Sequence, residues 1–235
     1  MHISEIGFCS GHSASGVWIN EKAETSVKGL YSAGDMAAVP HNYMLGAFTY
    51  GWFAGTNSAD YVSGREFSET DSAQIEAEKS RVYAPLIRTE GLPPNQVEYK
   101  LRRFVNDYLQ PPKVTKKMEI GLQRFDAIAA DIEQIKANNA HELMRAMEVS
   151  VIRDCAEMAA RASLFRKESR WGLYHYRVDY PQRNDAEWFC HCHLKKGDDG
   201  KMFSFKRDIE PYSISLNEKE QTAYQTLRLK VAANG

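Results

Sequence analysis

Four consecutive residues, Cys190, His191, Cys192 and His193, have the side-chain types that zinc prefers in proteins. The segment around them alternates apolar and polar residues, which predicts a β-strand. Successive side chains of a strand point to opposite faces, so the two cysteines would lie on one face and the two histidines on the other. Because one tetrahedral ion could not reach all four, we predict no metal site in this chain.

A second candidate for chemistry is the turn of Gly34 and Asp35, which follows a predicted short strand at residues 29–33. An apolar segment over residues 43–61 comes next and is predicted to form a helix. Three glycines lie in this segment: Gly46, Gly51 and Gly55. Since each glycine weakens a helix by roughly 1 kcal/mol, we expect close packing or a ligand against this helix.

Helices separated by glycine and proline breaks are predicted between about residues 66 and 170. Apolar residues recur there with a period near 3.6, which gives each helix one apolar stripe. The stripes are Val97, Leu101, Phe104 and Tyr108; Met118, Leu122, Phe125, Ile128, Ile132 and Ile135; and Met144, Met147, Val151, Cys155, Met158, Ala162 and Phe165. The third helix should begin at Asn138 or Asn139, since asparagine is a good N-cap. This pattern predicts an antiparallel helical bundle with the methionine-rich stripe in its core.

After the helices, residues 187–194 and 201–206 alternate around the turn signal at residues 197–200, which predicts a β-hairpin.

The composition excludes several classes of protein. The 235 residues are 43% hydrophobic and 26% charged, as in an ordinary globular protein. The net charge of −1 provides no overall field for nucleic acid or anionic lipid, which disfavours a helical nucleic-acid binder. The most apolar stretch, residues 37–54, contains Pro40, His41 and Asn42, so we predict no membrane span. Without a visible signal or transit peptide, and with four scattered cysteines, a cytoplasmic location with reduced thiols is expected.

Three separated segments resemble the C-terminal part of the fumarate reductase/succinate dehydrogenase flavoprotein family. Residues 29–37, with the sequence GLYSAGDMA, resemble the strand and acidic turn that close the flavin-binding domain of this family. Residues 11–20 resemble its segment in which a histidine, here His12, precedes a glycine-rich turn and a strand. Residues 167–188 are similar to its C-terminal signature, in which Glu-Ser-Arg-Gly leads to an Asp-Tyr-Pro turn. The order and spacing of all three agree with the family.

The resemblance implies an FAD-dependent oxidoreductase in which a hydride passes between substrate and flavin. It implies that Asp35 accepts hydrogen bonds from the ribityl chain, and that the positive end of the following helix stabilises negative charge on the reduced ring. The implied cofactor-binding residues are Gly34, Asp35, Leu45, Gly46 and Ala47, and the implied catalytic residues are His12 and His41. An iron–sulfur protein of the ferredoxin type is the implied electron partner.

Two departures limit what this resemblance implies. Met44 stands where succinate- and fumarate-active members have an arginine that holds a substrate carboxylate, so we expect a different substrate. The dinucleotide fingerprint G-x-G-x-x-G is absent from these 235 residues, and so is the capping domain that carries the arginine proton donor of the family. The FAD site in this chain is therefore expected to be incomplete and to need an N-terminal FAD-binding portion or subunit. Alone, the chain should bind FAD weakly or not at all.

The predicted fold is α+β. Residues 1–64 would be the C-terminal segment of a flavin-binding α/β domain, residues 65–177 an antiparallel helical bundle, and residues 178–235 a β-hairpin extension. Glu168, Ser169, Arg170 and Asp179 of the signature are expected to fix the bundle against the flavin domain.

Two alternatives stay open at this point. The chain could be a non-catalytic module that binds a partner flavoprotein or iron–sulfur subunit. A group of basic residues predicts either a solvated helix face or a docking surface for an acidic electron carrier. These residues are Lys100, Arg102, Arg103, Lys113, Lys116 and Lys117.

Overall fold

The computed structural model describes residues 15–39, 43–66, 69–170, 172 and 175–209. Within these residues the chain divides into two compact units, one ending at Glu78 and the other beginning at Lys79. Helix α2 (Ser72–Ile87) crosses this boundary. The division into domains at residues 64 and 177 stays a prediction.

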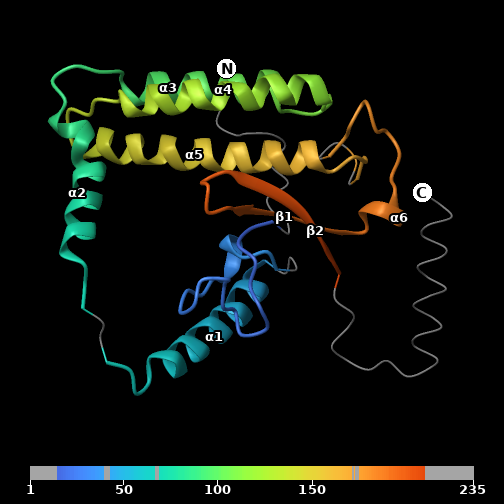
Figure 1. Ribbon diagram of the computed structural model, residues 1–235, viewed down its shortest axis with the longest axis horizontal. Helices are drawn as coiled ribbons and strands as arrows, with labels where there is room; N and C mark the ends of the chain where they lie inside the picture. The colour runs from blue at the N-terminus through green and yellow to red at the C-terminus, as the bar shows by residue number, and fades with distance from the viewer. Residues whose placement is uncertain (1–14, 40–42, 67–68, 171, 173–174, 210–235) are drawn as a thin grey trace. The chain divides into compact units, whose positions relative to one another are not determined.

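The second unit is built around three helices, α3 (Pro94–Tyr108), α4 (Thr115–Glu133) and α5 (Ala140–Phe165). Short connections make consecutive helices antiparallel, and the three lie side by side (Figure 1). The predicted stripes of the first two helices form the core, in which the rings of Phe104 and Phe125 meet edge to face at 5.0 Å. The antiparallel helical bundle is therefore confirmed.

Helix α5 begins where the sequence predicted, but a different face of it is buried. The Asn139 side chain accepts a hydrogen bond from the backbone N–H of Glu142, which confirms it as the N-cap. The predicted core stripe is wrong, since Met144 is 52% and Val151 61% exposed. The buried residues of α5 are mostly small: Ala146, Val149, Ala156, Glu157 and Ala160. Small side chains let α3 and α4 approach the backbone of α5 closely, and periodicity alone could not decide between two apolar faces.

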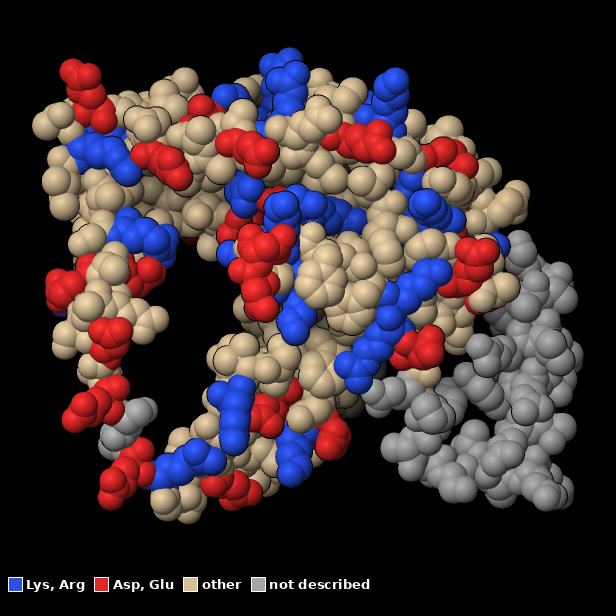
Figure 2. Space-filling model, viewed as in Figure 1, with Lys and Arg blue, Asp and Glu red and all other residues tan. Residues whose placement is uncertain are grey.

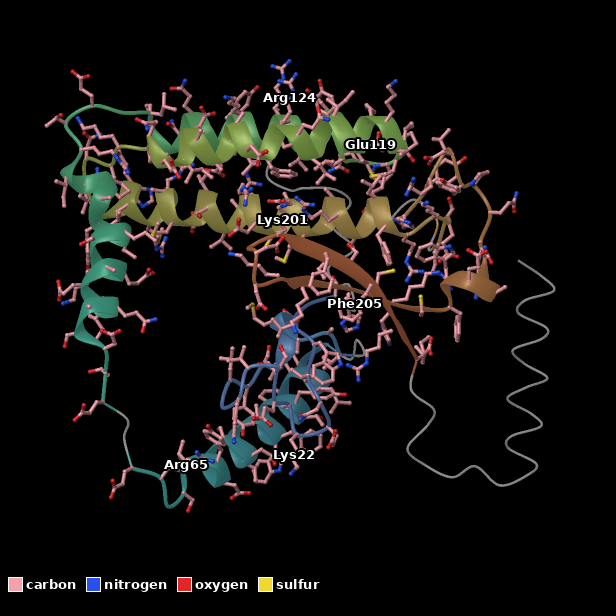
Figure 3. All side chains as sticks on the ribbon, in the orientation of Figure 1. Lys22, Arg65, Glu119, Arg124, Lys201 and Phe205 are labelled. Atoms are coloured by element: carbon pink, nitrogen blue, oxygen red, sulfur yellow. The ribbon has the colours of Figure 1, made fainter. Side chains whose placement is uncertain are left out.

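The described part of the chain ends in the predicted β-hairpin. A short helix, α6 (Asp185–Trp188), precedes strand β1 (Cys190–Lys196), which pairs antiparallel with β2 (Met202–Asp208). The backbone N–H of Gly197 donates to the carbonyl of Lys201 at 2.8 Å and closes the turn. The hairpin contacts α5, and Phe205 lies on its side away from that helix (Figures 1 and 3).

The first unit consists of helix α1 (Tyr43–Val62) and the irregular segment before it, which contains a short 3-10 helix, η1 (Gly34–Met36). The predicted strand over residues 29–33 is wrong, because only Tyr31 forms a bridge, to Glu24. Single backbone hydrogen bonds flank this bridge, from Thr25 N–H to the Leu30 carbonyl and from Ser32 N–H to the Ala23 carbonyl, and a turn closed by Leu30 N–H and the Val27 carbonyl joins the two segments. Among the described residues, no helix is both long and apolar enough to cross a membrane.

Candidate functional site

The acidic turn lies directly against α1. Gly34 has a φ of +69°, a left-handed conformation that glycine adopts without a steric cost. A Cβ built on Gly34 would lie 3.7 Å from the Cβ of Ala47, so the turn contacts the beginning of α1. The structure thus brings together two of the predicted cofactor-binding residues that are thirteen positions apart in the chain.

The next part of the site is the start of α1. The first four amides of a helix have no partner within the helix, and its N-terminal end carries a partial positive charge. Of the predicted residues here, Gly46 is buried, whereas Leu45 is 69% exposed and Ala47 is exposed. Asp35 is also exposed. Asp35 follows Gly34 directly, so the acidic residue belongs to the same turn that contacts the beginning of α1.

A third segment joins this turn. The backbone N–H of Val17 donates to the carbonyl of Met36 at 2.7 Å, and the N–H of Ala38 donates to the carbonyl of Val17 at 2.9 Å. A Cβ on Gly16 would lie 2.5 Å from the Met36 carbonyl oxygen, so this approach requires glycine. The two N-terminal segments of the family resemblance therefore pack together. The predicted catalytic residues His12 and His41 lie outside the described residues, and their roles stay predictions.

Tyr31 holds α1 against the segment that precedes it, through contacts with Asn57 and Tyr61 of the helix. Its hydroxyl donates to the carbonyl of Asn57 at 3.2 Å, and its ring meets that of Tyr61 edge on at 6.4 Å. Gly29 completes this contact, since a Cβ there would lie 2.8 Å from the Tyr61 ring. These contacts hold the helix in place behind the acidic turn.

Met44 occupies the place that the resemblance assigns to a carboxylate-binding arginine. It lies in the first turn of α1 and is 70% exposed. A thioether is a weak acceptor and carries no charge, so Met44 cannot form an ion pair with a carboxylate.

The C-terminal signature folds into a buried polar network around Glu168. Its carboxylate is fully buried and accepts hydrogen bonds from Arg166 at 2.6 Å, from Arg170 at 2.6 and 3.0 Å, and from the backbone N–H of Asn184 at 2.8 Å. Burial opposes ionisation, but the hydrogen bonds from these groups hold the pKa of Glu168 below its ordinary value. Arg170 also donates to Asp185 at 2.6 Å. Glu168 therefore fixes the end of α5 to the segment before the hairpin.

Arg177 is the second centre of this network, and sequence reasoning missed its role. It is fully buried and pairs with both oxygens of Asp179 at 2.9 Å, while its Nη1 donates to the carbonyls of Ser163 and Arg166 at 2.7 and 3.0 Å. The hydrogen bonds from Arg177, against the effect of burial, lower the pKa of Asp179 strongly. The available signal was the close spacing of an arginine and an aspartate, Arg177 and Asp179, at a predicted turn, since a turn brings side chains two residues apart within reach of each other.

Lys113 and His175 lie beside Arg177 and lose part of their hydration. Lys113 donates to the hydroxyl of Ser163 at 2.8 Å, and burial together with the charge of Arg177 lowers its pKa to about 8. Burial and the charge of Lys113 lower the pKa of His175 to about 4. The prediction of a solvated position is therefore wrong for Lys113. The polar partner of Lys113, and the partners described above for Glu168 and Arg177, all lie in the second unit, which begins at Lys79.

Other predicted basic residues lie next to acidic ones. Arg102 pairs with Glu98 at 2.8 Å, and Lys100 forms an ion pair with Asp131. Basic and acidic side chains alternate over the visible face of the bundle, where Arg124 of α4 points outward (Figures 2 and 3). This mixture favours a solvated face, and docking of an acidic carrier stays a prediction.

The hairpin places the cysteines and histidines of β1 on opposite faces. The register pairs Cys192 with Lys206 and His193 with Phe205, and the rings of His191 and His193 lie 6.1 Å apart. In the described part of the chain, no three His, Cys, Asp or Glu residues are grouped so that they could hold a metal ion.

Comparisons with known proteins agree with this architecture. Residues 98–226 match the model of a protein family described as the fumarate reductase flavoprotein C-terminus. An uncharacterized FAD-dependent oxidoreductase of Methanocaldococcus jannaschii is 25% identical over 75% of this chain, and the succinate dehydrogenase flavoprotein subunit of Bacillus subtilis is 26% identical over 75%. The adenylylsulfate reductase of Archaeoglobus fulgidus has a similar structure, with a TM-score of 0.76 and 30% identity over 83% of this chain.

These similarities cover only part of each relative. The matched region makes up 33% of both the M. jannaschii and the B. subtilis protein and 34% of the A. fulgidus chain. This chain thus spans about a third of the length of the curated relatives that it matches.

Proposed function

This chain belongs to the fumarate reductase flavoprotein family and matches the C-terminal part of its members, and from that premise we propose that it completes the flavin site of an FAD-dependent oxidoreductase. The remaining part of the site, including the pyrophosphate-binding glycine loop, would come from the N-terminal FAD-binding portion. The family consists of FAD flavoproteins, so the class of cofactor follows from membership.

The observation that carries this proposal is the contact between the acidic turn and the start of α1. Asp35 would accept hydrogen bonds from ribityl hydroxyls, and the backbone at Leu45, Gly46 and Ala47 would face the flavin edge. Bound FAD would supply the hydride-transfer chemistry of the enzyme. The amides at the start of α1 would donate toward the ring edge and stabilise negative charge there.

The substrate of the complete enzyme is proposed to differ from succinate and fumarate. Succinate- and fumarate-active members of the family have an arginine where this chain has the exposed Met44. The arginine forms an ion pair with a substrate carboxylate, and the thioether of Met44 cannot form one. His12 or His41 would then orient the substrate. Electrons would be exchanged with an iron–sulfur partner of the ferredoxin type.

A reconstitution experiment tests the flavin site. The chain is mixed with a separately expressed N-terminal FAD-binding portion of the flavoprotein from the same organism, and visible flavin absorbance is measured after removal of free FAD. We expect the complex to retain flavin. The Asp35→Ala variant should weaken FAD binding about 10- to 100-fold, because it removes hydrogen bonds to a charged group worth about 1.5–3 kcal/mol.

Asp60→Ala is the matched control, since Asp60 is an exposed carboxylate on α1. It should leave FAD affinity unchanged. Equal FAD affinity of the Asp35→Ala variant and the wild type would contradict the assigned role of Asp35. Association without flavin would instead support the non-catalytic interaction module.

A further inference from the structure

Cys190 and Cys192 share one face of strand β1, and this face is turned toward α5. Side chains two residues apart in a strand point to the same side. Phe205 pairs with His193 across the hairpin and lies on the side away from α5 (Figure 3), so the histidines occupy that side as well. The strand therefore places its two thiols next to each other on the side that contacts α5.

The guanidinium of Arg166, at the end of α5, lies beside this pair of thiols. Its Nη2 donates to the Cys190 carbonyl at 2.7 Å, and its Nη1 donates to the Trp188 carbonyl at 2.8 Å. Burial raises the pKa of the Cys192 thiol, the charge of Arg166 opposes this shift, and the neighbouring Cys190 adds to it. Both cysteines are half-buried and carry free thiols. The two thiols are therefore close together and within reach of a small reagent.

We infer that Cys190 and Cys192 form a redox-active dithiol, which a small disulfide such as oxidised glutathione converts reversibly into an intramolecular disulfide. The pair lies in the second unit, and the inference does not depend on the proposed flavin site.

The spacing of a β-strand permits this bridge and makes it labile. Residues two apart in a strand have Cα atoms about 6.4–6.8 Å apart, and natural disulfides join Cα atoms up to about 6.8 Å apart. A bridge between Cys190 and Cys192 would therefore form near the upper limit of the allowed distance. Disulfides close to this limit are more easily reduced than structural ones, which is typical of bonds that form and break in response to redox conditions.

The position of Cys190 at the start of β1 lets the backbone adjust to the bridge. Cys190 is the first residue of the strand and pairs with Asp208, the last residue of β2, whereas Cys192 pairs with Lys206 further along the ladder. A small shift of Cys190 toward Cys192 disturbs only the terminal pair of the hairpin. The hydrogen bond from Arg166 to the Cys190 carbonyl is the contact with α5 that oxidation would affect first.

The exchange with oxidised glutathione proceeds in two balanced steps. The Cys190 thiolate attacks one sulfur of the small disulfide, so that the sulfur–sulfur bond breaks, a mixed disulfide forms on Cys190 and one glutathione leaves as its thiolate. The Cys192 thiolate then attacks the Sγ of Cys190, which closes the intramolecular bond and releases the second glutathione. The protein loses two electrons and two protons, and the small disulfide gains them as two thiols. Cys190 reacts first because burial keeps Cys192 protonated.

Equilibration with glutathione, followed by peptide mass spectrometry, tests this inference. The chain is incubated without oxygen in mixtures of reduced and oxidised glutathione, the reaction is stopped with acid, and free thiols are alkylated. As the oxidised fraction rises, the peptide that contains Cys190 and Cys192 should lose two hydrogen atoms and carry no glutathione. Cys155, an exposed thiol on α5, is the control and should carry glutathione instead. Excess reduced glutathione should restore both thiols of the pair.

The Cys192→Ser variant separates a dithiol from two independent thiols. The variant lacks the second nucleophile, so glutathione on Cys190 should accumulate severalfold above the wild-type level. The Cys155→Ser variant should still form the intramolecular disulfide. Circular dichroism of the reduced variants checks that their helices are unchanged.

Four results in the wild-type chain would overturn the inference. A lasting glutathione adduct on Cys190 would show that Cys192 does not reach it. A disulfide from either residue of the pair to Cys9 or Cys155 would show a different partner. Two free thiols under conditions that fully modify Cys155 would show that the pair is not redox-active, and a bond that resists excess reduced glutathione would contradict its reversibility.

Discussion

Replacing Glu168 with glutamine should strongly destabilise the second unit, which contains the helical bundle. The Glu168 carboxylate is fully buried and accepts four hydrogen bonds, three of them from the guanidinium groups of Arg166 and Arg170. Glutamine keeps the shape of the Glu168 side chain but removes its negative charge. The amide group of glutamine, itself a hydrogen-bond donor, would face the donor groups of the arginines or of the Asn184 backbone. Two arginines would lose their shared buried partner.

The expected size of the effect follows from this geometry. Breaking a buried ion pair by changing one partner costs about 3–5 kcal/mol, because the remaining charge is left without compensation. Arg170 keeps its bond to Asp185, and Arg166 keeps its bonds to the carbonyls of Trp188 and Cys190, which reduces the loss. We therefore expect the Glu168→Gln variant to lose about 3 kcal/mol of the free energy of unfolding.

The assay is urea unfolding followed by far-UV circular dichroism, which reports mainly on the bundle helices. Glu119→Gln is the control, because Glu119 is an exposed carboxylate on α4 (Figure 3) and should change stability by less than about 0.5 kcal/mol. The folded pKa of Glu168 lies below the ordinary 4.5, so its contribution is complete above pH 4.5 and is lost as the pH falls through the folded value. The difference between wild type and the Glu168→Gln variant should therefore shrink in acid. A loss at neutral pH no larger than that of the control would refute the reasoning.

Three further predictions concern single positions. The Gly51→Ala variant should raise the stability of the isolated chain by roughly 0.5–1 kcal/mol, as measured by thermal unfolding, since alanine favours helix and meets open space there. The folded pKa of His175 is about 4, below the ordinary 6.5, so urea unfolding should show a loss on the order of 2 kcal/mol between pH 7 and pH 5 that the His175→Gln variant lacks. Burial raises the pKa of Cys192, whereas Cys155 is exposed. Alkylation at pH 8, read by peptide mapping, should therefore modify Cys155 first; equal rates would contradict this burial.

The bundle and the hairpin were predictable because each depends on a pattern within one segment. The period of 3.6 around Leu101 and Phe125, the cap at Asn139 and the turn at residues 197–200 are local signals, and the structure confirms the elements that they predict. The start of α5 was readable for the same reason.

The errors concern choices that depend on distant residues. Helix α5 has apolar residues on two faces, and the packing of α3 and α4 selects the alanine face over the face of Met144 and Val151. Lys113 was expected in solvent, but it is half-buried beside Ser163, where Arg177 returns sixty-four residues later in the chain. Of the candidate site, the contact of Gly34 with Ala47 is observed, whereas His12 and His41 lie outside the described residues.

Arg177 recognises the end of α5 through main-chain oxygens, since its Nη1 contacts the carbonyls of Ser163, Leu164 and Arg166. Every amino acid presents the same carbonyl group, so for this contact the three positions are free to change during evolution. Arg177 has no such freedom, because lysine lacks the planar fork that reaches Asp179 and these oxygens together. Leu164, whose side chain forms no polar contact in this network, should therefore be free to vary among homologues, whereas the guanidinium of Arg177 should be kept.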